Sequence, residues 1–418
     1  MPLSHLAESL IGSEIIKLAS EIQEKIKQGR HIYNFTIGDF NPALFPIPER
    51  FRELIIEAYL SGFTNYPAAE GNADLRQAVS NFIKHYQGLS YSPDEILISS
   101  GGRPLIYAIY RSVVDRGDKV IYSVPSWNNN HYTHFVEGEH IAVETQPENN
   151  FMLTAEELKP HIHGATLLAL CSPLNPTGTT FTREGLKAIC DLVVEENNRR
   201  GANEKKLYIL FDQIYWILCY GKTKHLDPVT ICPELRPYTL FVDGMSKSFA
   251  ATGVRVGWAM GPAKVIGKMK SILSHIGAWS PMPEQKAAAV YLTETKQIDT
   301  YLDHFKNEIH QRLEEIHAGF QQLRLKGYAV DSIDPEAAIY LTIQLNLRGK
   351  TDTSGNRLES QQDVTTYILD QAGIAVVPFS SFGSPKESTW YRLSVGTCKL
   401  EEIQPMLQGL ETALSKLN

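Results

Sequence analysis

A lysine and an arginine stand eight positions apart in the stretch GMSKSFAATGVRVGW, residues 244–258, where most neighbouring side chains are small. The amine of Lys247 could form a Schiff base with an aldehyde. The guanidinium of Arg255 could grip a phosphate through a bidentate, charge-assisted contact. We expect the small residues to let a ligand lie close to the backbone. We also expect Gly253 and Gly257 to let the chain turn so that Arg255 points back at the phosphate.

Further candidate residues stand at the ends of short β-rich runs: Gly101, Gly102 and Arg103 after 95–100, Trp127 after 119–124, Asn175 after 165–171, Asp212 and Tyr215 at and after the end of 207–212. Glycines at a helix start expose backbone N–H groups to an anion such as phosphate. A carboxylate could keep a pyridine nitrogen protonated, an amide and a phenol could bond a phenolate oxygen, and an indole could stack on a ring. An aldehyde, a phosphate, a phenolate and a pyridinium on one ring describe pyridoxal phosphate.

The elements that would position these residues alternate between strand-like and helix-like runs. The expected strands are 95–100, 119–124, 140–145, 165–171, 207–212 and 239–244. Several are apolar throughout, which is typical of strands covered on both faces. The alternation predicts an α/β fold with a mainly parallel, doubly wound sheet, where ligands lie beyond the carboxyl ends of the strands.

The chain of 418 residues is too long for one ordinary core. We expect a large domain over 46–290 and a smaller α+β domain made of 1–45 and 291–418. The smaller domain would contain an amphipathic helix at 13–29 and a long helix at 297–326. Further strands are expected at 338–345, 373–378 and 390–396, and a helix is expected to begin near Asn72 as its N-cap.

The composition limits the possible partners. The formal net charge of -7 gives no electrostatic case for nucleic acid. No apolar window is long enough to span a bilayer, and the N-terminus does not resemble a signal peptide. The five cysteines are scattered and fit a reducing cytoplasm, and the histidines show no metal-ligand spacing.

Several motifs follow one another in a fixed order: NPTG, an Asp-x-x-Tyr after a strand, and Ser-Lys followed by Gly-x-Arg-x-Gly. In this order, the set resembles the fold-type I pyridoxal-phosphate aminotransferases of class I/II, over nearly the whole chain. TGVRVGWAMGP is most similar to the bacterial aspartate aminotransferase subgroup. The resemblance implies a mainly parallel, mixed seven-stranded sheet sandwiched by helices, plus a smaller α+β domain.

The resemblance also implies roles for matching positions. Lys247 would bond the cofactor and then move a proton at the substrate Cα. The other cofactor-binding positions would be Asp212 at the pyridine nitrogen, Asn175 and Tyr215 at the ring oxygen, Trp127 on the ring face, and Gly101, Gly102, Arg103, Ser246 and Arg255 around the phosphate. Tyr66 would reach the phosphate of a neighbouring subunit, which implies a homodimer with shared sites. Arg392 and Gly38 would hold the substrate α-carboxylate, beside Trp127 and Asn175.

Two positions depart from the pattern of the resemblance. Many members have a serine where this chain has Gly244. The similar bacterial subgroup has a lysine, in contact with the distal carboxylate of the substrate, where this chain has Arg103. The charge is retained but the geometry differs.

The expected function is ping-pong transamination between an amino acid, with aspartate or another acidic one favoured, and a 2-oxo acid such as 2-oxoglutarate. The alternatives on the same scaffold are aromatic, alanine or branched-chain transamination and a β-eliminating lyase. A non-catalytic cofactor-binding regulator would need an N-terminal DNA-binding module, for which residues 1–30 are too short. A nicotinamide dehydrogenase lacks the G-x-G-x-x-G motif.

Overall fold

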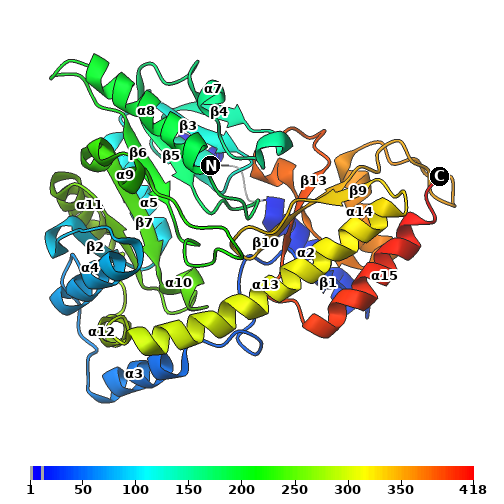
Figure 1. Ribbon diagram of the computed structural model, residues 1–418, viewed down its shortest axis with the longest axis horizontal. Helices are drawn as coiled ribbons and strands as arrows, with labels where there is room; N and C mark the ends of the chain where they lie inside the picture. Colours follow the sequence, from blue (N-terminus) through cyan, green and yellow to red (C-terminus); the bar gives the residue numbers. More distant parts are fainter. Residues whose placement is uncertain (1–2, 11–13) are drawn as a thin grey trace.

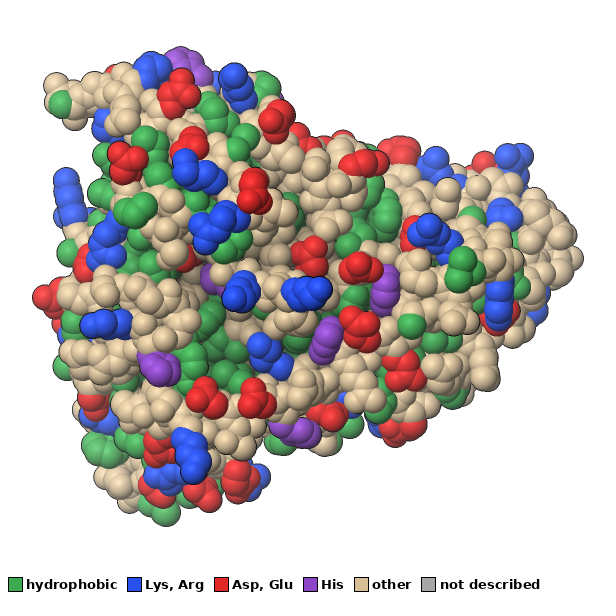
Figure 2. Space-filling view, viewed as in Figure 1, with side chains coloured by type: hydrophobic (Ala, Val, Ile, Leu, Met, Phe, Trp, Pro, Cys, Tyr) green, Lys and Arg blue, Asp and Glu red, His purple; other side chains and the backbone are tan. Residues whose placement is uncertain are grey.

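The computed structural model describes residues 3–10 and 14–418 (Figure 1). A large sheet with helices on both faces lies at one end of the molecule, and a smaller group of strands and helices lies at the other. The long helix α13 (Thr295–Leu325) runs from the first group to the second. Acidic and basic side chains are interspersed over the face seen in Figure 2.

Within the described residues, the large sheet has seven strands in the spatial order β2-β8-β7-β6-β5-β3-β4. Their bounds are β2 Ile96–Ser99, β3 Lys119–Val124, β4 Glu139–Glu144, β5 Ala165–Cys171, β6 Tyr208–Asp212, β7 Thr239–Gly244 and β8 Gly257–Met260. β8 pairs antiparallel with β2 and β7, and the other pairs are parallel. The expected mixed, mainly parallel seven-stranded sheet is therefore confirmed.

The helices of the described residues are α1 His5–Glu8, α2 Glu14–Lys27, α3 Glu49–Leu60, α4 Ala73–Gln87, α5 Gly102–Val113, α6 Asn129–Phe135, α7 Ala155–Leu158, α8 Arg183–Arg199, α9 Pro228–Ile231, α10 Met245–Ser248, α11 Ala263–Ile276, α12 Met282–Tyr291, α13, α14 Gln361–Ala372 and α15 Ile403–Leu414. The helix expected at 13–29 is α2, and residue 13 lies outside the described residues. Asn72 is the N-cap of α4, but its side chain makes no cap hydrogen bond and its amide donates to Met282 Sδ instead.

Successive residues of the central strands pack on opposite faces of the large sheet. Leu210 of β6 and Val242 of β7 belong to the core cluster that includes residues of α5 and α11. Phe211 and Phe241, each one residue away, belong to the cluster on the other face, which includes residues of α4 and α8. This two-sided burial explains why these strand sequences are apolar throughout.

The second group contains a four-stranded antiparallel sheet, counted over the described residues, in the order β12-β13-β10-β9, and a short parallel pair of β1 and β11. Their bounds are β1 Tyr33–Asn34, β9 Val330–Ser332, β10 Tyr340–Leu345, β11 Ile374–Ala375, β12 Val377–Pro378 and β13 Trp390–Ser394. The single run expected at 373–378 is therefore split between β11 and β12.

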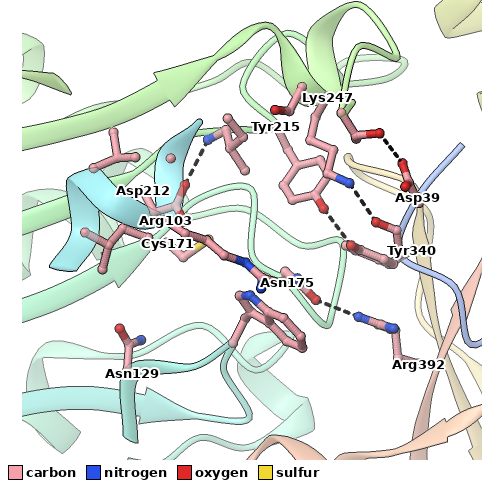
Figure 3. Close-up of a pocket in the computed structure, with 18 of the residues that line it drawn as sticks. Asp39, Arg103, Asn129, Cys171, Asn175, Asp212, Tyr215, Lys247, Tyr340 and Arg392 are labelled. Atoms are coloured by element: carbon pink, nitrogen blue, oxygen red, sulfur yellow. Dashed lines mark hydrogen bonds between the residues drawn. The ribbon is translucent and has the colours of Figure 1, made fainter. Parts of the chain in front are cut away.

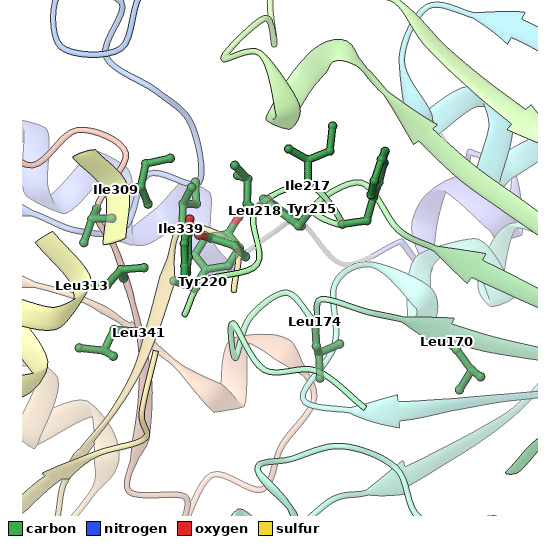
Figure 4. Close-up of a cluster of buried hydrophobic side chains, with 14 of the residues drawn as sticks. Leu170, Leu174, Tyr215, Ile217, Leu218, Tyr220, Ile309, Leu313, Ile339 and Leu341 are labelled. Atoms are coloured by element: carbon green, nitrogen blue, oxygen red, sulfur yellow. Dashed lines mark hydrogen bonds between the residues drawn. The ribbon is translucent and has the colours of Figure 1, made fainter. Parts of the chain in front are cut away.

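One buried cluster connects the two groups (Figure 4). Leu170 of β5 belongs to the same cluster as Leu313 of α13 and Leu341 of β10. This shared core holds β10 and β13 near the carboxyl ends of the large sheet. The domain bounds 46–290 and 1–45 plus 291–418 remain a prediction. Within the described residues, no helix combines the length and apolar character that a membrane span requires.

Candidate active site

A pocket of about 630 Å³ lies beyond the carboxyl ends of β5, β6 and β7, where the sequence predicts a ligand. Its lining includes most of the candidate residues: Gly38, Gly102, Arg103, Trp127, Asn175, Asp212, Tyr215, Ser246, Lys247, Arg255 and Arg392. Figure 3 shows several of them facing one space although they come from distant parts of the chain. Among the described residues, Gly101 and Tyr66 are the candidates outside this lining.

Lys247 enters the pocket from α10, the short helix that directly follows β7. Its Nζ donates a hydrogen bond of 2.6 Å to the backbone carbonyl of Gly38 (Figure 3). Burial lowers the pKa of Lys247 to about 8, against the opposing negative charge of Asp39. Nearby arginines lower this pKa further. A larger share of the amine is therefore neutral, and nucleophilic, than at an exposed lysine.

Asp212 closes β6 and reaches the pocket from the same face of the sheet as Leu210. Its Oδ1 accepts a hydrogen bond of 3.0 Å from the backbone N–H of Ile214. Burial raises the pKa of Asp212 to about 6, and that N–H bond opposes the rise. A carboxylate in such surroundings gains from a cationic partner in the pocket.

Arg255 lies against the N-terminus of α5. Its Nη1 donates to the carbonyl of Thr252 at 2.6 Å and its Nη2 donates to the carbonyl of Ser100 at 2.7 Å. Gly101 has φ +89, and a Cβ there would meet Nη2 of Arg255 at 2.2 Å. Only glycine therefore lets the guanidinium sit beside the free N–H end of the helix, and together they form a corner whose positive charge suits an anion.

Gly253 and Gly257 do not provide the turn before Arg255 that the sequence predicts. Positive φ values occur at Arg255 itself, +61, and at Ala250, +50, so the turn does not depend on Gly253. Gly257 is needed for close packing, because a Cβ there would meet the backbone carbon of Gly101 at 2.6 Å. Gly244 is equally tight, since a Cβ would meet Gly257 Cα at 2.8 Å. A serine at position 244 would not fit this backbone.

Arg392 projects from β13 and is only 2% exposed. Its Nη1 donates to Asn175 Oδ1 at 3.1 Å and its Nη2 donates to the Thr36 carbonyl at 2.7 Å. Its Nε has no hydrogen-bond partner, and no carboxylate of the described residues pairs with it. A buried cation without a counter-ion favours an incoming carboxylate.

Tyr215 forms a pair with Tyr340, a residue that the sequence did not single out. Their hydroxyl oxygens are 2.5 Å apart (Figure 3), and burial raises the pKa of both phenols. Tyr340 also lies under the guanidinium of Arg392, with 4.8 Å from Cζ to the ring centroid. Tyr340 stands in β10, and only folding brings that strand to the pocket.

Arg103 and Trp127 form another contact, with Arg103 Cζ 5.4 Å from the indole centroid. The side chain of Arg103 is exposed and forms no hydrogen bond or ion pair with another described residue. Asp39 is another pocket residue that the sequence did not single out. Its Oδ1 accepts a hydrogen bond of 2.7 Å from Thr252 Oγ1. Its place beside Gly38 in the GDF tripeptide is the signal that could have indicated it.

Tyr66 is 81% exposed and packs edge-on against Trp279, with 5.2 Å between ring centroids. Tyr66 is therefore not part of the pocket lining in this chain. Ser246, beside Lys247, is buried and lines the pocket.

Known proteins resemble this chain over nearly its whole length. Residues 30–410 match the family described as aminotransferase class I and II. The chain is 28% identical over 389 residues to an aspartate aminotransferase of Bacillus sp. (strain YM-2), with 92% of each chain covered. It is 29% identical over 419 residues to an aspartate/prephenate aminotransferase of Thermus thermophilus, with 99% of each covered. The crystal structure of an aspartate aminotransferase from Rhizobium meliloti superposes with a TM-score of 0.91, at 26% identity over 100% of both chains. These matches identify the chain as an aminotransferase of the class I and II family.

Proposed function

We propose that this aminotransferase exchanges an amino group between an acidic amino acid, with aspartate favoured, and a 2-oxo acid such as 2-oxoglutarate. The reaction would follow a ping-pong order and use pyridoxal 5′-phosphate. The observation that carries the proposal is the placement of three groups in one pocket: the low-pKa amine of Lys247, the anion-binding corner at Arg255, and the unpaired guanidinium of Arg392.

The residues present fit pyridoxal 5′-phosphate. Its phosphate suits the corner formed by Arg255, the start of α5 and Ser246, where glycine at 101 leaves room that a Cβ would fill. Asp212 suits a protonated ring nitrogen, because burial disfavours an unpaired carboxylate. Asn175, Tyr215 and Trp127 supply the polar and aromatic groups for the ring oxygen and the ring face.

When bound, pyridoxal 5′-phosphate supplies an aldehyde that condenses with amines and a ring that withdraws electrons from the substrate Cα. Lys247 would hold the aldehyde until an amino acid displaces it, and would then carry the proton at Cα. Arg392 would fix the α-carboxylate, which orients the Cα–H bond for Lys247. The hydrogen bond from Arg392 to Asn175 joins the substrate-binding cation to the ring-binding amide.

The preference for an acidic substrate rests on Arg103. This cation lines the pocket, contacts the face of Trp127, and has no charge partner among the described residues. Its positive charge also lowers the pKa values of Lys247 and Arg255. A second carboxylate on the substrate would relieve this concentration of positive charge. The names of the relatives from Bacillus and Thermus support the same preference.

A homodimer with shared sites would explain the exposure of Tyr66. Other apolar side chains exposed near it in the sequence are Ile56, Tyr59, Leu60 and Phe63. A group of exposed apolar side chains is typical of a protein interface. Mixed dimers test this proposal: combining Tyr66→Ala and Lys247→Ala subunits should restore activity above the sum of the two separate variants. Mixed dimers with no added activity would argue against a shared site.

A panel of amino acids, each assayed with 2-oxoglutarate, tests the proposed reaction. Aspartate should give the highest kcat/KM. When the oxo acid is left out, product formation should stop after one turnover. Multiple-turnover release of ammonia and pyruvate without an acceptor would instead indicate a β-lyase. Absence of oxo-acid product from every amino acid would refute the proposal.

A further inference from the structure

A second carboxyl group lies behind Asp212, on the other face of the large sheet. Asp243 stands near the end of β7 and is 0% exposed. Its Oδ2 accepts a hydrogen bond of 2.7 Å from Trp216 Nε1, and its Oδ1 accepts one of 2.7 Å from the backbone N–H of Gly244. It is absent from the pocket lining formed by the described residues, and the reaction proposed above does not use it.

The strand register fixes how the two carboxyls are related. In the β6–β7 pair, Asp212 lies opposite Val242, so Asp243 is one residue further along the neighbouring strand. Strand spacing and rise then put the two Cα atoms roughly 6 Å apart. Asp212 shares the face of Leu210 and Val242, whereas Asp243 shares the opposite face with Phe241. The pair therefore spans the sheet at the floor of the pocket.

The surroundings of Asp243 supply no compensating positive charge. Among the described residues, no cation forms an ion pair with it, and the titratable group that acts on it is Asp212. His225 lies beside Trp216, with ring centroids 6.1 Å apart, but burial lowers the pKa of His225 to about 3, so it is neutral. A side-chain hydrogen bond from Gln213 to Asp243 favours the ionised carboxylate and opposes the effect of burial on its pKa. Gln213 Oε1 also lies 3.3 Å from His225 Nε2.

Two carboxyls on neighbouring strands, with no cation of the described residues paired to either, each make ionisation of the other less favourable. Burial raises the pKa of Asp243 to about 8, and the negative charge of Asp212 contributes to the rise. The pKa of Asp212 is lower, about 6. Asp243 is fully buried without a cationic partner in the described part of the chain, whereas Asp212 lines the pocket, so the first negative charge on the pair is better accommodated at Asp212.

We propose that Asp243 is a positioning residue that acts through Asp212: it retains the proton of the carboxyl pair, so that the pair's one negative charge faces the pocket. This inference rests on the role proposed above for Asp212. At alkaline pH, ionised Asp243 would add a second negative charge behind Asp212 and strengthen its hold on a cationic ring nitrogen.

Infrared spectroscopy of the full-length protein tests the pair directly, because a buried protonated carboxylic acid has its own carbonyl band. In the wild type, this band should disappear as the pH rises, with a midpoint near 8. Asp243→Asn should remove the component of the band that titrates near pH 8. Asp212→Asn, which leaves residue 243 unaltered, should lower the midpoint by about one pH unit or more, because the neighbouring charge is gone. The control Asp227→Asn, at the buried cap of α9, should leave the midpoint unchanged.

Addition of pyridoxal 5′-phosphate separates this inference from the proposed function. A ring cation next to Asp212 should also lower the midpoint. A midpoint that shifts in Asp212→Asn but not on adding the cofactor would support the carboxyl pair and count against the proposed role of Asp212. A midpoint unmoved in Asp212→Asn, or a band component with a midpoint near pH 8 that persists in Asp243→Asn, would overturn the inference.

The kinetic consequence is a change in pH profile. In the holoenzyme, Asp243→Asn should move the alkaline limb of kcat/KM to lower pH, because the second negative charge is no longer formed. A uniform loss at every pH, with the limb in place, would show that Asp243 has only a structural role.

Discussion

Lys247 Nζ donates a 2.6 Å hydrogen bond to the carbonyl of Gly38, which stands 209 residues earlier in the chain. This bond joins α10, at the end of the large sheet, to the loop between β1 and α3. Gly38 in turn lies against Tyr340 and Arg392, two side chains of the second group that line the pocket. A Cβ on Gly38 would meet Tyr340 Oη at 2.9 Å and Arg392 Nη1 at 3.5 Å. The positions of the Lys247 amine and the Arg392 guanidinium thus depend on one loop.

Substitution of Gly38 should weaken binding of every substrate. In Gly38→Ala, the added methyl group displaces Tyr340 or Arg392, so kcat/KM should fall roughly ten- to hundredfold. The loss should be similar for aspartate and alanine, because both carry the α-carboxylate. Gly267→Ala on α11 is the matched control, since a Cβ there meets nothing within 4 Å. Steady-state kinetics with both amino acids measure the effect, and a loss confined to aspartate would contradict it.

The low pKa of Lys247 predicts how cofactor loading depends on pH. The neutral amine is the nucleophile, and the folded-state pKa of about 8 lies below the ordinary lysine value. The rate of loading pyridoxal 5′-phosphate into the apoenzyme should therefore level off above pH 8. Well below pH 8 it should fall by about tenfold per pH unit. Stopped-flow absorbance follows this reaction, and a rate still rising steeply between pH 9 and pH 10 would indicate an ordinary lysine.

Substitution of Arg103 should lower kcat/KM selectively for acidic substrates. A charge-assisted hydrogen bond is worth about 1.5–3 kcal/mol, so Arg103→Ala should lower kcat/KM for aspartate roughly ten- to 150-fold. The value for alanine should change little. Arg111→Ala, an exposed arginine on the same helix, is the control. Equal losses for aspartate and alanine would remove the reason to favour acidic substrates.

The hydrogen bond between Tyr215 and Tyr340 predicts a smaller loss of activity when Tyr340 is substituted. Tyr340→Phe removes the hydroxyl that lies 2.5 Å from Tyr215 Oη, while the ring stays under Arg392. Loss of one hydrogen bond of about 1 kcal/mol should reduce kcat roughly fivefold and leave the KM for amino acids nearly unchanged. Tyr367→Phe removes a buried hydroxyl bonded to Ala413 O, outside the pocket lining, and should leave kcat unchanged. A change in KM alone would assign Tyr340 to Arg392 rather than to Tyr215.

The large sheet was predictable because its strands are buried on both faces. β3, β5 and β7 have the bounds expected from their apolar runs. β8 was not predicted, because it has only four residues, begins at the last glycine of the Gly-x-Arg-x-Gly motif and carries no alternation. The residues that end the strands were found for the same reason: polar groups stand out directly after apolar runs.

Residues that tertiary packing brings to the site were harder to predict. Tyr340 and Asp243 stand inside runs that look like ordinary strands, and nothing local distinguishes them. The turn before Arg255 was also misjudged, since the sequence favours glycine for positive φ, whereas Ala250 and Arg255 adopt it. Close packing between Gly101 and Gly257 depends on two strand ends that are distant in the sequence.

The central claim is that the Lys247 amine is the covalent attachment point for pyridoxal 5′-phosphate. Borohydride reduction of the loaded enzyme, followed by peptide mass spectrometry, measures this directly. The account predicts one reduced phosphopyridoxyl group, on Lys247, and none in Lys247→Ala, which should still bind the cofactor without a covalent bond. An adduct on a different lysine, or an unmodified Lys247 in a fully loaded protein, would contradict it.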